Sequence, residues 1–192
     1  QFELADLRDH LTVDVPPKKL DENLLVATWN IRHFGGLTEK WTAGSEDSPK
    51  RDLRSLRVIA EIVRRFDVIG LQEVRGKLKA LRHLMKLLGP DWGLSLTDVT
   101  KGHAGNNERM AFIFDTRKVQ LSGLACELVV PPQWDEQIPG DALERQFART
   151  PYAVSFRGGG HTFILVALHV LWGDRSSDRI PELRSIAHWL RD

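Results

Sequence analysis

Three polar residues follow apolar runs in this sequence, at points where predicted strands end. They are Asn30, Glu73 and His169, and the runs before them read Val-Ala-Thr-Trp, Val-Ile-Gly-Leu-Gln and Leu-Val-Ala-Leu. A carboxylate at the end of a buried strand is costly unless an opposite charge accompanies it. Hard divalent cations take oxygen ligands, and an imidazole adds acid–base chemistry. An acid, an amide and an imidazole in these positions predict a metal-assisted phosphodiester hydrolysis site.

Each of these residues also has a purely structural explanation. Asn30 could satisfy backbone groups at its strand end, and His169 could be a hydrogen-bonded core residue. Glu73 could form a structural ion pair with Arg75. The catalytic interpretation of His169 gains weight if a carboxylate orients one ring nitrogen, and Glu108, which opens the run Glu-Arg-Met-Ala-Phe-Ile-Phe, is the candidate.

Arginine is the side chain best suited to bind phosphate, because its planar guanidinium donates two parallel hydrogen bonds. Arg149 precedes Thr-Pro-Tyr at a predicted strand start, where it could hold phosphate oxygens in this way. A solvated or salt-bridged arginine is the alternative. The run 158–160, Gly-Gly-Gly, predicts only a turn between two strands, because a glycine-rich phosphate loop should open a helix.

Strands and helices alternate along the chain, without repeats. A helix is predicted to begin at Pro49 and to expose Arg51, Arg54 and Arg57 on its polar face. Further helices are predicted over 78–88 and 179–190, and strands over 24–30, 67–72, 93–99, 108–115, 119–129, 152–157 and 162–169. Many strands with few helices between them favour an α+β fold in which two sheets pack together with helices outside.

Composition describes an ordinary chain of about one domain: 192 residues, 42% hydrophobic and 28% charged. Its formal charge of +1 gives no overall basic field, so attraction to a polyanion must come from local clusters. Cys126 is the only cysteine, which excludes a disulfide or a cysteine-type zinc site within the chain. No apolar run is long enough to span a membrane, and the cellular compartment stays open.

Taken in order, five stretches resemble the endonuclease/exonuclease/phosphatase superfamily, and within it the deoxyribonuclease-I-like branch. The resemblance covers roughly residues 24–190. The stretches are Trp29-Asn-Ile-Arg-His-Phe-Gly35, Leu71-Gln-Glu-Val-Arg75, Asn107-Glu-Arg-Met-Ala-Phe-Ile-Phe114, Arg149-Thr-Pro-Tyr-Ala-Val154 and Val166-Ala-Leu-His169.

The resemblance implies a four-layer α/β/β/α sandwich with the site at one edge. It implies that Glu73 binds Mg²⁺, with Mn²⁺ or Ca²⁺ as alternatives, and that Asn30 lies beside the metal and the scissile phosphate. His169 and Glu108 match a catalytic histidine–carboxylate pair, with His169 as an acid or electrophile. The residues expected to contact phosphate or substrate are Arg75, Arg149 and Arg32.

The resemblance also implies that part of the catalytic domain is absent from this sequence. The family's Gly-Asp-x-Asn motif and its late Ser-Asp-His motif should follow the last helix, and neither is present. We therefore expect an N-terminal extension over 1–22 and a partial, C-terminally truncated domain over 23–192, with impaired activity. The expected activity is Mg²⁺-dependent endonuclease-like hydrolysis of nucleic acid, DNA before RNA. The alternatives are a lipid-headgroup phosphatase or phosphodiesterase and a non-catalytic nucleic-acid-binding module.

Overall fold

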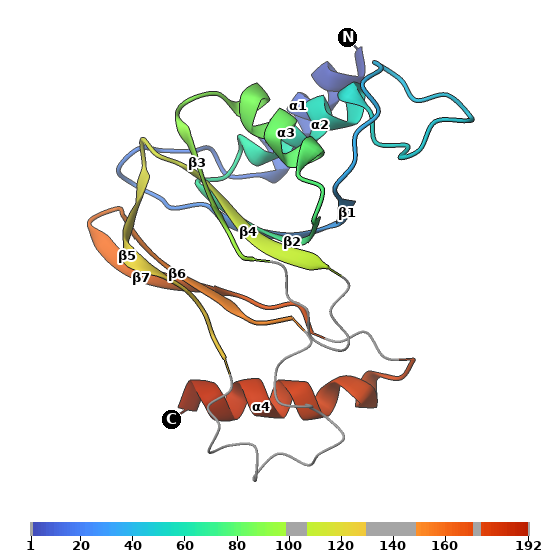
Figure 1. Ribbon diagram of the computed structural model, residues 1–192. Helices are drawn as coiled ribbons and strands as arrows, with labels where there is room; N and C mark the ends of the chain where they lie inside the picture. Colours follow the sequence, from blue (N-terminus) through green and yellow to red (C-terminus); the bar gives the residue numbers. More distant parts are fainter. Residues whose placement is uncertain (1, 99–106, 130–148, 171–173, 192) are drawn as a thin grey trace.

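Two sheets and four α-helices make up the computed structural model, which describes residues 2–98, 107–129, 149–170 and 174–191 (Figure 1). The elements in chain order are α1 (Phe2–Asp14), β1 (Val26–Phe34), α2 (Leu53–Val63), β2 (Val68–Arg75), α3 (Lys79–Leu88), β3 (Trp92–Leu96), β4 (Glu108–Asp115), β5 (Val119–Glu127), β6 (Tyr152–Gly158), β7 (His161–Ala167), the 3₁₀ turn η2 (Ser176–Arg179) and α4 (Ile180–Arg191).

The layers follow the order helices, sheet, sheet, helix. The first sheet has the strand order β1-β2-β4-β3, and the second has the order β5-β6-β7. Among the strands that the structure describes, β1 and β2 pair in parallel, and the other neighbours are antiparallel. In Figure 1, α1, α2 and α3 lie on the outer side of the first sheet, the second sheet faces its inner side, and α4 lies beyond the second sheet. The predicted α+β fold with four layers is confirmed.

Two hydrophobic cores hold these layers together. The first lies between the first sheet and its helices, and includes Leu56 and Val63 of α2 and Leu84 of α3. The second lies between the sheets, where the rings of Phe112 and Phe156 meet edge to face with centroids 5.6 Å apart. Strand β2 is buried on both faces along most of its length, as its continuous apolar run predicts.

Helix α2 begins later than the sequence predicts. Its N-cap is Asp52, whose carboxylate accepts a hydrogen bond from the backbone N–H of Ser55, 2.8 Å away. Aspartate at this position satisfies a backbone donor that the first helical turn leaves unpaired. The predicted start at Pro49 is therefore wrong. The helix starts at Leu53, and its apolar stripe then faces the first core.

The segment before β1 is tied to the rest of the chain by charged groups. Lys18 Nζ lies 3.1 Å from Asp67 Oδ1 and 2.8 Å from Asp115 Oδ2, and both aspartate side chains are almost fully buried. Lys118 Nζ lies 3.1 Å from the second oxygen of Asp67, and Arg117 pairs with Asp115 at 2.7 Å. Helix α1 is joined to α2 by a salt bridge of 2.8 Å between Arg8 and Glu61.

In the described residues, no helix is long and apolar enough to cross a membrane.

The buried ion pairs of Asp67 and Asp115 with Lys18, Lys118 and Arg117 make the stability of the fold depend on pH. Burial opposes the ionisation of Asp115, but Arg117 and Lys18 outweigh it and hold the pKa of that carboxyl well below its usual range. Because the pKa is lower in the folded chain than in the unfolded chain, the carboxylate contributes stability above pH about 4 and loses it as the pH falls further. We expect the urea midpoint to fall between pH 5 and pH 3. The midpoint should fall less in Asp115→Asn. An equal fall of the midpoint in the two proteins would show that Asp115 does not cause this pH dependence.

Candidate active site

Strands β1 and β2 carry irregularities at the same level of the first sheet. Asn30 pairs with Gln72 and Phe34 pairs with Val74, so three residues of β1 lie opposite a single residue of β2. On its other side, β2 has one residue more than β4 between successive partners, so Glu73 also lies in a bulge. Bulges bend a strand and redirect its side chains, and they are common beside active sites.

These bulges correct one detail of the sequence-based prediction. Asn30 and Glu73 do not lie at strand ends, because β1 continues to Phe34 and β2 continues to Arg75. The polar side chains interrupt the strands where the pairing register shifts. His169 lies two residues beyond β7, which ends at Ala167.

Several residues at or next to these bulges have a left-handed backbone conformation. Arg32, His33 and Glu73 have φ angles of 44°, 51° and 62°, and Asn107, the residue before Glu108, has a φ of 53°. These are the positive-φ residues other than glycine in the described ranges. Each such residue costs about 1–2 kcal/mol relative to the right-handed form, so surrounding contacts must hold it. The local backbone is thus specified by its partners and not by its own preference.

Glu73 is held mainly by neutral donors. The backbone N–H of His33 donates to Glu73 Oε2 at 3.0 Å, and the side-chain amide of Asn30 donates a second hydrogen bond. Burial opposes ionisation of Glu73, but these two hydrogen bonds, together with the nearby imidazoles of His169 and His33, outweigh it and lower the pKa of the carboxyl. Glu73 is therefore ionised at neutral pH, and its charge is available to a cation.

Glu108 is different, because arginines surround it. Arg149 Nε contacts Glu108 Oε2, and Arg75 Nη2 lies 3.4 Å from Glu108 Oε1. Arg149 is almost fully buried, with an exposed fraction of 9%. Its Nη1 atom has no hydrogen-bond partner among the described residues. An unpartnered buried guanidinium nitrogen is costly unless an anion can reach it. Both predicted arginines thus reach the site, where they also neutralise Glu108.

His169 lies between the two carboxylates. Its Nδ1 atom is 3.2 Å from Glu108 Oε2, and its Nε2 atom is 3.9 Å from Glu73 Oε1. The two groups that were predicted to pair therefore lie close together, but Nδ1 of His169 has no hydrogen-bond partner among the described residues. Burial and the charge of Arg149 lower the pKa of His169 in spite of both carboxylates. The neutral imidazole is the favoured form at pH 7, and not the imidazolium that the acid role requires.

His33 is a site residue that the sequence did not single out. Arg75 Nε donates to His33 Nδ1 at 3.0 Å. Gly35 permits the close approach of the two strands here, because a Cβ atom on it would lie 2.7 Å from Cβ of Arg75. Arg32 has an exposed side chain beside the site, and its backbone N–H donates to Asn30 Oδ1 at 3.2 Å. All seven predicted site residues thus lie in or beside one constellation.

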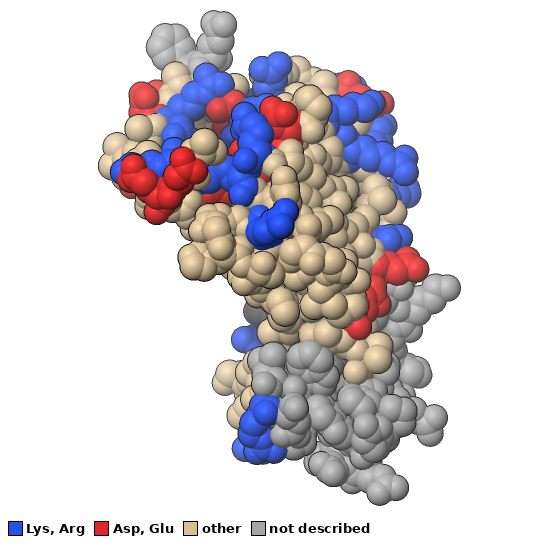
Figure 2. Space-filling view, turned by 90° about the vertical axis from the view of Figure 1, so that its left-hand side faces the viewer, with Lys and Arg blue, Asp and Glu red and all other residues tan. Residues whose placement is uncertain are grey.

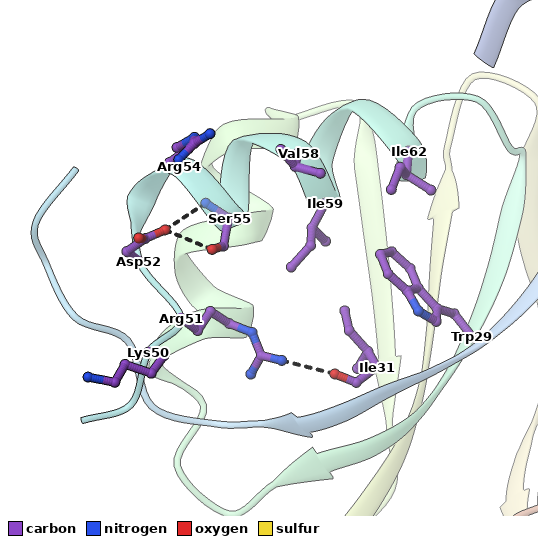
Figure 3. Close-up of a pocket in the computed structure, with 10 residues that line it drawn as sticks. All are labelled: Trp29, Ile31, Lys50, Arg51, Asp52, Arg54, Ser55, Val58, Ile59 and Ile62. Carbon is purple, nitrogen blue, oxygen red and sulfur yellow. Dashed lines mark hydrogen bonds between the residues drawn. The ribbon is translucent and has the colours of Figure 1, made fainter. Parts of the chain in front are cut away.

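Arg51 contradicts the prediction that it is an exposed helical residue. It precedes the N-cap of α2, is half-buried, and lines a cavity of about 570 Å³ between α2 and β1 (Figure 3). Its guanidinium donates to the carbonyl oxygen of Ile31 at 2.9 Å (Figure 3). Nothing in the sequence around Arg51 indicates this contact, because it depends on the bulge in β1.

The donor set fits a magnesium ion better than zinc. The described residues contain no group of three or more His, Cys, Asp or Glu that could hold a metal. Zinc sites in proteins usually have three or four such ligands, whereas Mg²⁺ is commonly bound by one or two carboxylates together with water and phosphate oxygens. Glu73 with the Asn30 amide matches the second pattern.

Charge on the molecular surface is mixed. In the view of Figure 2, Lys and Arg side chains alternate with Asp and Glu over the upper, helical part, and the surface below them is largely uncharged. This face therefore offers no broad basic patch, in agreement with the formal charge of +1.

Comparison with known proteins gives a consistent result. The model of the Endonuclease/Exonuclease/phosphatase family matches residues 27–176. A curated protein of Thioalkalivibrio sp. (strain K90mix), named "Deoxyribonuclease", is 27% identical over 190 residues, which are 95% of this chain and 45% of that protein. This chain thus spans less than half the length of that relative.

Two solved structures share the fold. A humanized D. rerio TDP2 superposes with a TM-score of 0.53 at 13% identity, over 88% of this chain and 56% of that one. TDP2 from Caenorhabditis elegans gives a TM-score of 0.53 at 15% identity, over 98% of this chain and 48% of that one. At these identities the likeness shows the fold alone.

Proposed function

Because the chain belongs to the endonuclease/exonuclease/phosphatase family, we propose that its site takes part in Mg²⁺-dependent hydrolysis of a phosphodiester bond in nucleic acid. The observation that carries this proposal is the ionised Glu73, held by neutral donors beside the amide of Asn30. The carboxylate lies within 4 Å of the imidazole of His169, and the arginines on Glu108 are close by.

Glu73 and Asn30 would hold the metal. A bound Mg²⁺ supplies charge neutralisation on the phosphoryl oxygens and activates water for attack. Glu73 needs no rearrangement for this role, because the N–H of His33 and the Asn30 amide already fix its carboxylate and favour its charged form. Fixed, preorganised charge is the main source of stabilisation in such sites.

His169 would move a proton at Nε2. The carboxylate of Glu108 near Nδ1 favours the tautomer that carries its proton there, which leaves the Nε2 lone pair on the side of Glu73. A neutral imidazole with a free lone pair accepts a proton, and its lowered pKa keeps this form populated at neutral pH. Arg149 would bind a phosphoryl oxygen through the nitrogen that has no partner in the described part of the chain.

We propose DNA as the first substrate and RNA as the second. The curated relative is named "Deoxyribonuclease", and its similarity extends over 95% of this chain. A lipid-headgroup phosphatase or phosphodiesterase activity would use the same metal and arginine chemistry, so the preference for DNA rests on the similarity to this relative.

Three substrates incubated with the chain in parallel test this proposal: supercoiled plasmid, RNA, and vesicles that contain phosphoinositides. We expect plasmid nicking in Mg²⁺, none when EDTA removes the metal, slower RNA cleavage, and no release of phosphate or headgroup from the vesicles. Faster lipid hydrolysis than nicking would contradict the nucleic-acid assignment. Salt-dependent DNA binding that needs no Mg²⁺ and leaves every substrate intact would instead favour the non-catalytic binding module.

A further inference from the structure

The guanidinium of Arg51 donates hydrogen bonds to three consecutive backbone carbonyl groups of β1. Arg51 Nη2 donates to the carbonyl oxygens of Ile31 and Arg32 at 2.9 and 2.8 Å, and Nη1 donates to that of His33 at 2.8 Å. The same guanidinium lies over the ring of Phe34, 4.9 Å from its centroid. Figure 3 shows Arg51 reaching from the start of α2 toward β1.

This arrangement requires the bulge. In a regular strand, successive carbonyl groups point in opposite directions, so one side chain cannot bind three of them in a row. Arg32 and His33 are left-handed, and this turns their carbonyl oxygens to the side of Arg51. Three charge-assisted hydrogen bonds on one guanidinium in turn offset the cost of two left-handed residues. Arg51 and the bulge conformation therefore stabilise each other.

The backbone N–H groups of the bulge serve the site instead. That of His33 donates to Glu73, and that of Arg32 donates to the side-chain oxygen of Asn30. The carbonyl groups of the bulge thus bind Arg51, whereas its N–H groups orient the two proposed metal-binding side chains. We propose that Arg51 is a positioning residue for the metal site, which it controls through the bulge of β1. This inference rests on the proposed function.

Arginine is needed for this role because of its shape. Its planar guanidinium presents several N–H groups in fixed directions, whereas the ammonium group of lysine is a compact point charge on a flexible stem. Lysine at position 51 would keep the charge but could not reproduce all three contacts. The pair Arg51→Lys and Arg51→Ala therefore separates geometry from charge. Arg57, an exposed residue within α2, provides a control in Arg57→Ala.

The experiment combines Mn²⁺ titration calorimetry with hydrogen–deuterium exchange of the peptide that covers 31–34. We expect Arg51→Ala and Arg51→Lys to bind Mn²⁺ about tenfold more weakly than the parent chain. We also expect faster exchange in the bulge peptide, with peptides of β4 and β6 unchanged. Arg57→Ala should match the parent chain in both measurements.

Two results would overturn the inference. The first is unchanged exchange of the bulge peptide in Arg51→Ala, which would show that the bulge holds its conformation without the guanidinium. The second is full Mn²⁺ affinity in Arg51→Lys, which would show that a positive charge suffices. If the parent chain binds no Mn²⁺ at all, the proposed function fails, and the exchange data still decide whether Arg51 holds the bulge.

Discussion

Replacement of Glu73 by Gln is expected to lower Mg²⁺-dependent plasmid nicking by about a hundredfold. Glutamine has the same shape, and its carbonyl oxygen can still accept the hydrogen bond from the N–H of His33. What the substitution removes is the negative charge that would bind the metal. The measurement is the initial nicking rate of the two proteins at equal concentration.

A matched control separates this effect from a general loss of charge. Glu39→Gln removes an exposed carboxylate that pairs with Lys79 at 2.9 Å, and we expect a nicking rate within twofold of the parent chain. A Glu73→Gln protein as active as Glu39→Gln would show that Glu73 is a structural carboxylate. Equal unfolding midpoints of the two variants would exclude misfolding as the cause of lost activity.

The second large effect concerns stability. Asp67→Asn is expected to lower the free energy of unfolding by about 3 kcal/mol. Asp67 is fully buried and faces two ammonium groups, those of Lys18 and Lys118, each 3.1 Å from one of its oxygens. It also accepts a hydrogen bond from the backbone N–H of Leu25 at 2.8 Å. An asparagine there leaves the buried charge of Lys118 without its partner, which is the costly way to break a buried ion pair.

Urea unfolding at pH 7 measures this loss. Asp91→Asn is the control, because Asp91 and its partner Arg117 are both more than half exposed and 3.7 Å apart. We expect less than about 0.5 kcal/mol for that change. Equal midpoints for the two variants would show that the cluster contributes nothing to stability. Activity per folded molecule should stay the same in both.

The sequence predicted the fold because the fold follows from local patterns, and the structure places the residues that the sequence singled out for a site close together. The apolar run before Glu73 indicated a buried strand, and the order of the motifs indicated which strands bring Glu73, Glu108 and His169 together. A carboxylate that follows an apolar run is conspicuous in the sequence, because burying it without a partner is costly. In the structure, the carboxylates of Glu73 and Glu108 both lie beside the imidazole of His169.

Other features could not be predicted, because they arise from strand pairing. The contacts of His33 and Arg51 depend on a register shift between β1 and β2, and a register is a property of two distant segments. Helix α1 was missed for another reason. Its apolar residues do not gather on one face, so periodicity gives no signal, and its contact with α2 is an ion pair.

Titration calorimetry of the chain with Mn²⁺, with Mg²⁺ as competitor, tests whether Glu73 and Asn30 form a metal site. We expect one site per chain, displacement by Mg²⁺, and affinity at least about tenfold lower in Glu73→Gln. Equal Mn²⁺ binding by the parent chain and Glu73→Gln, or no binding by either, would contradict the assignment of Glu73 and Asn30 as the metal site.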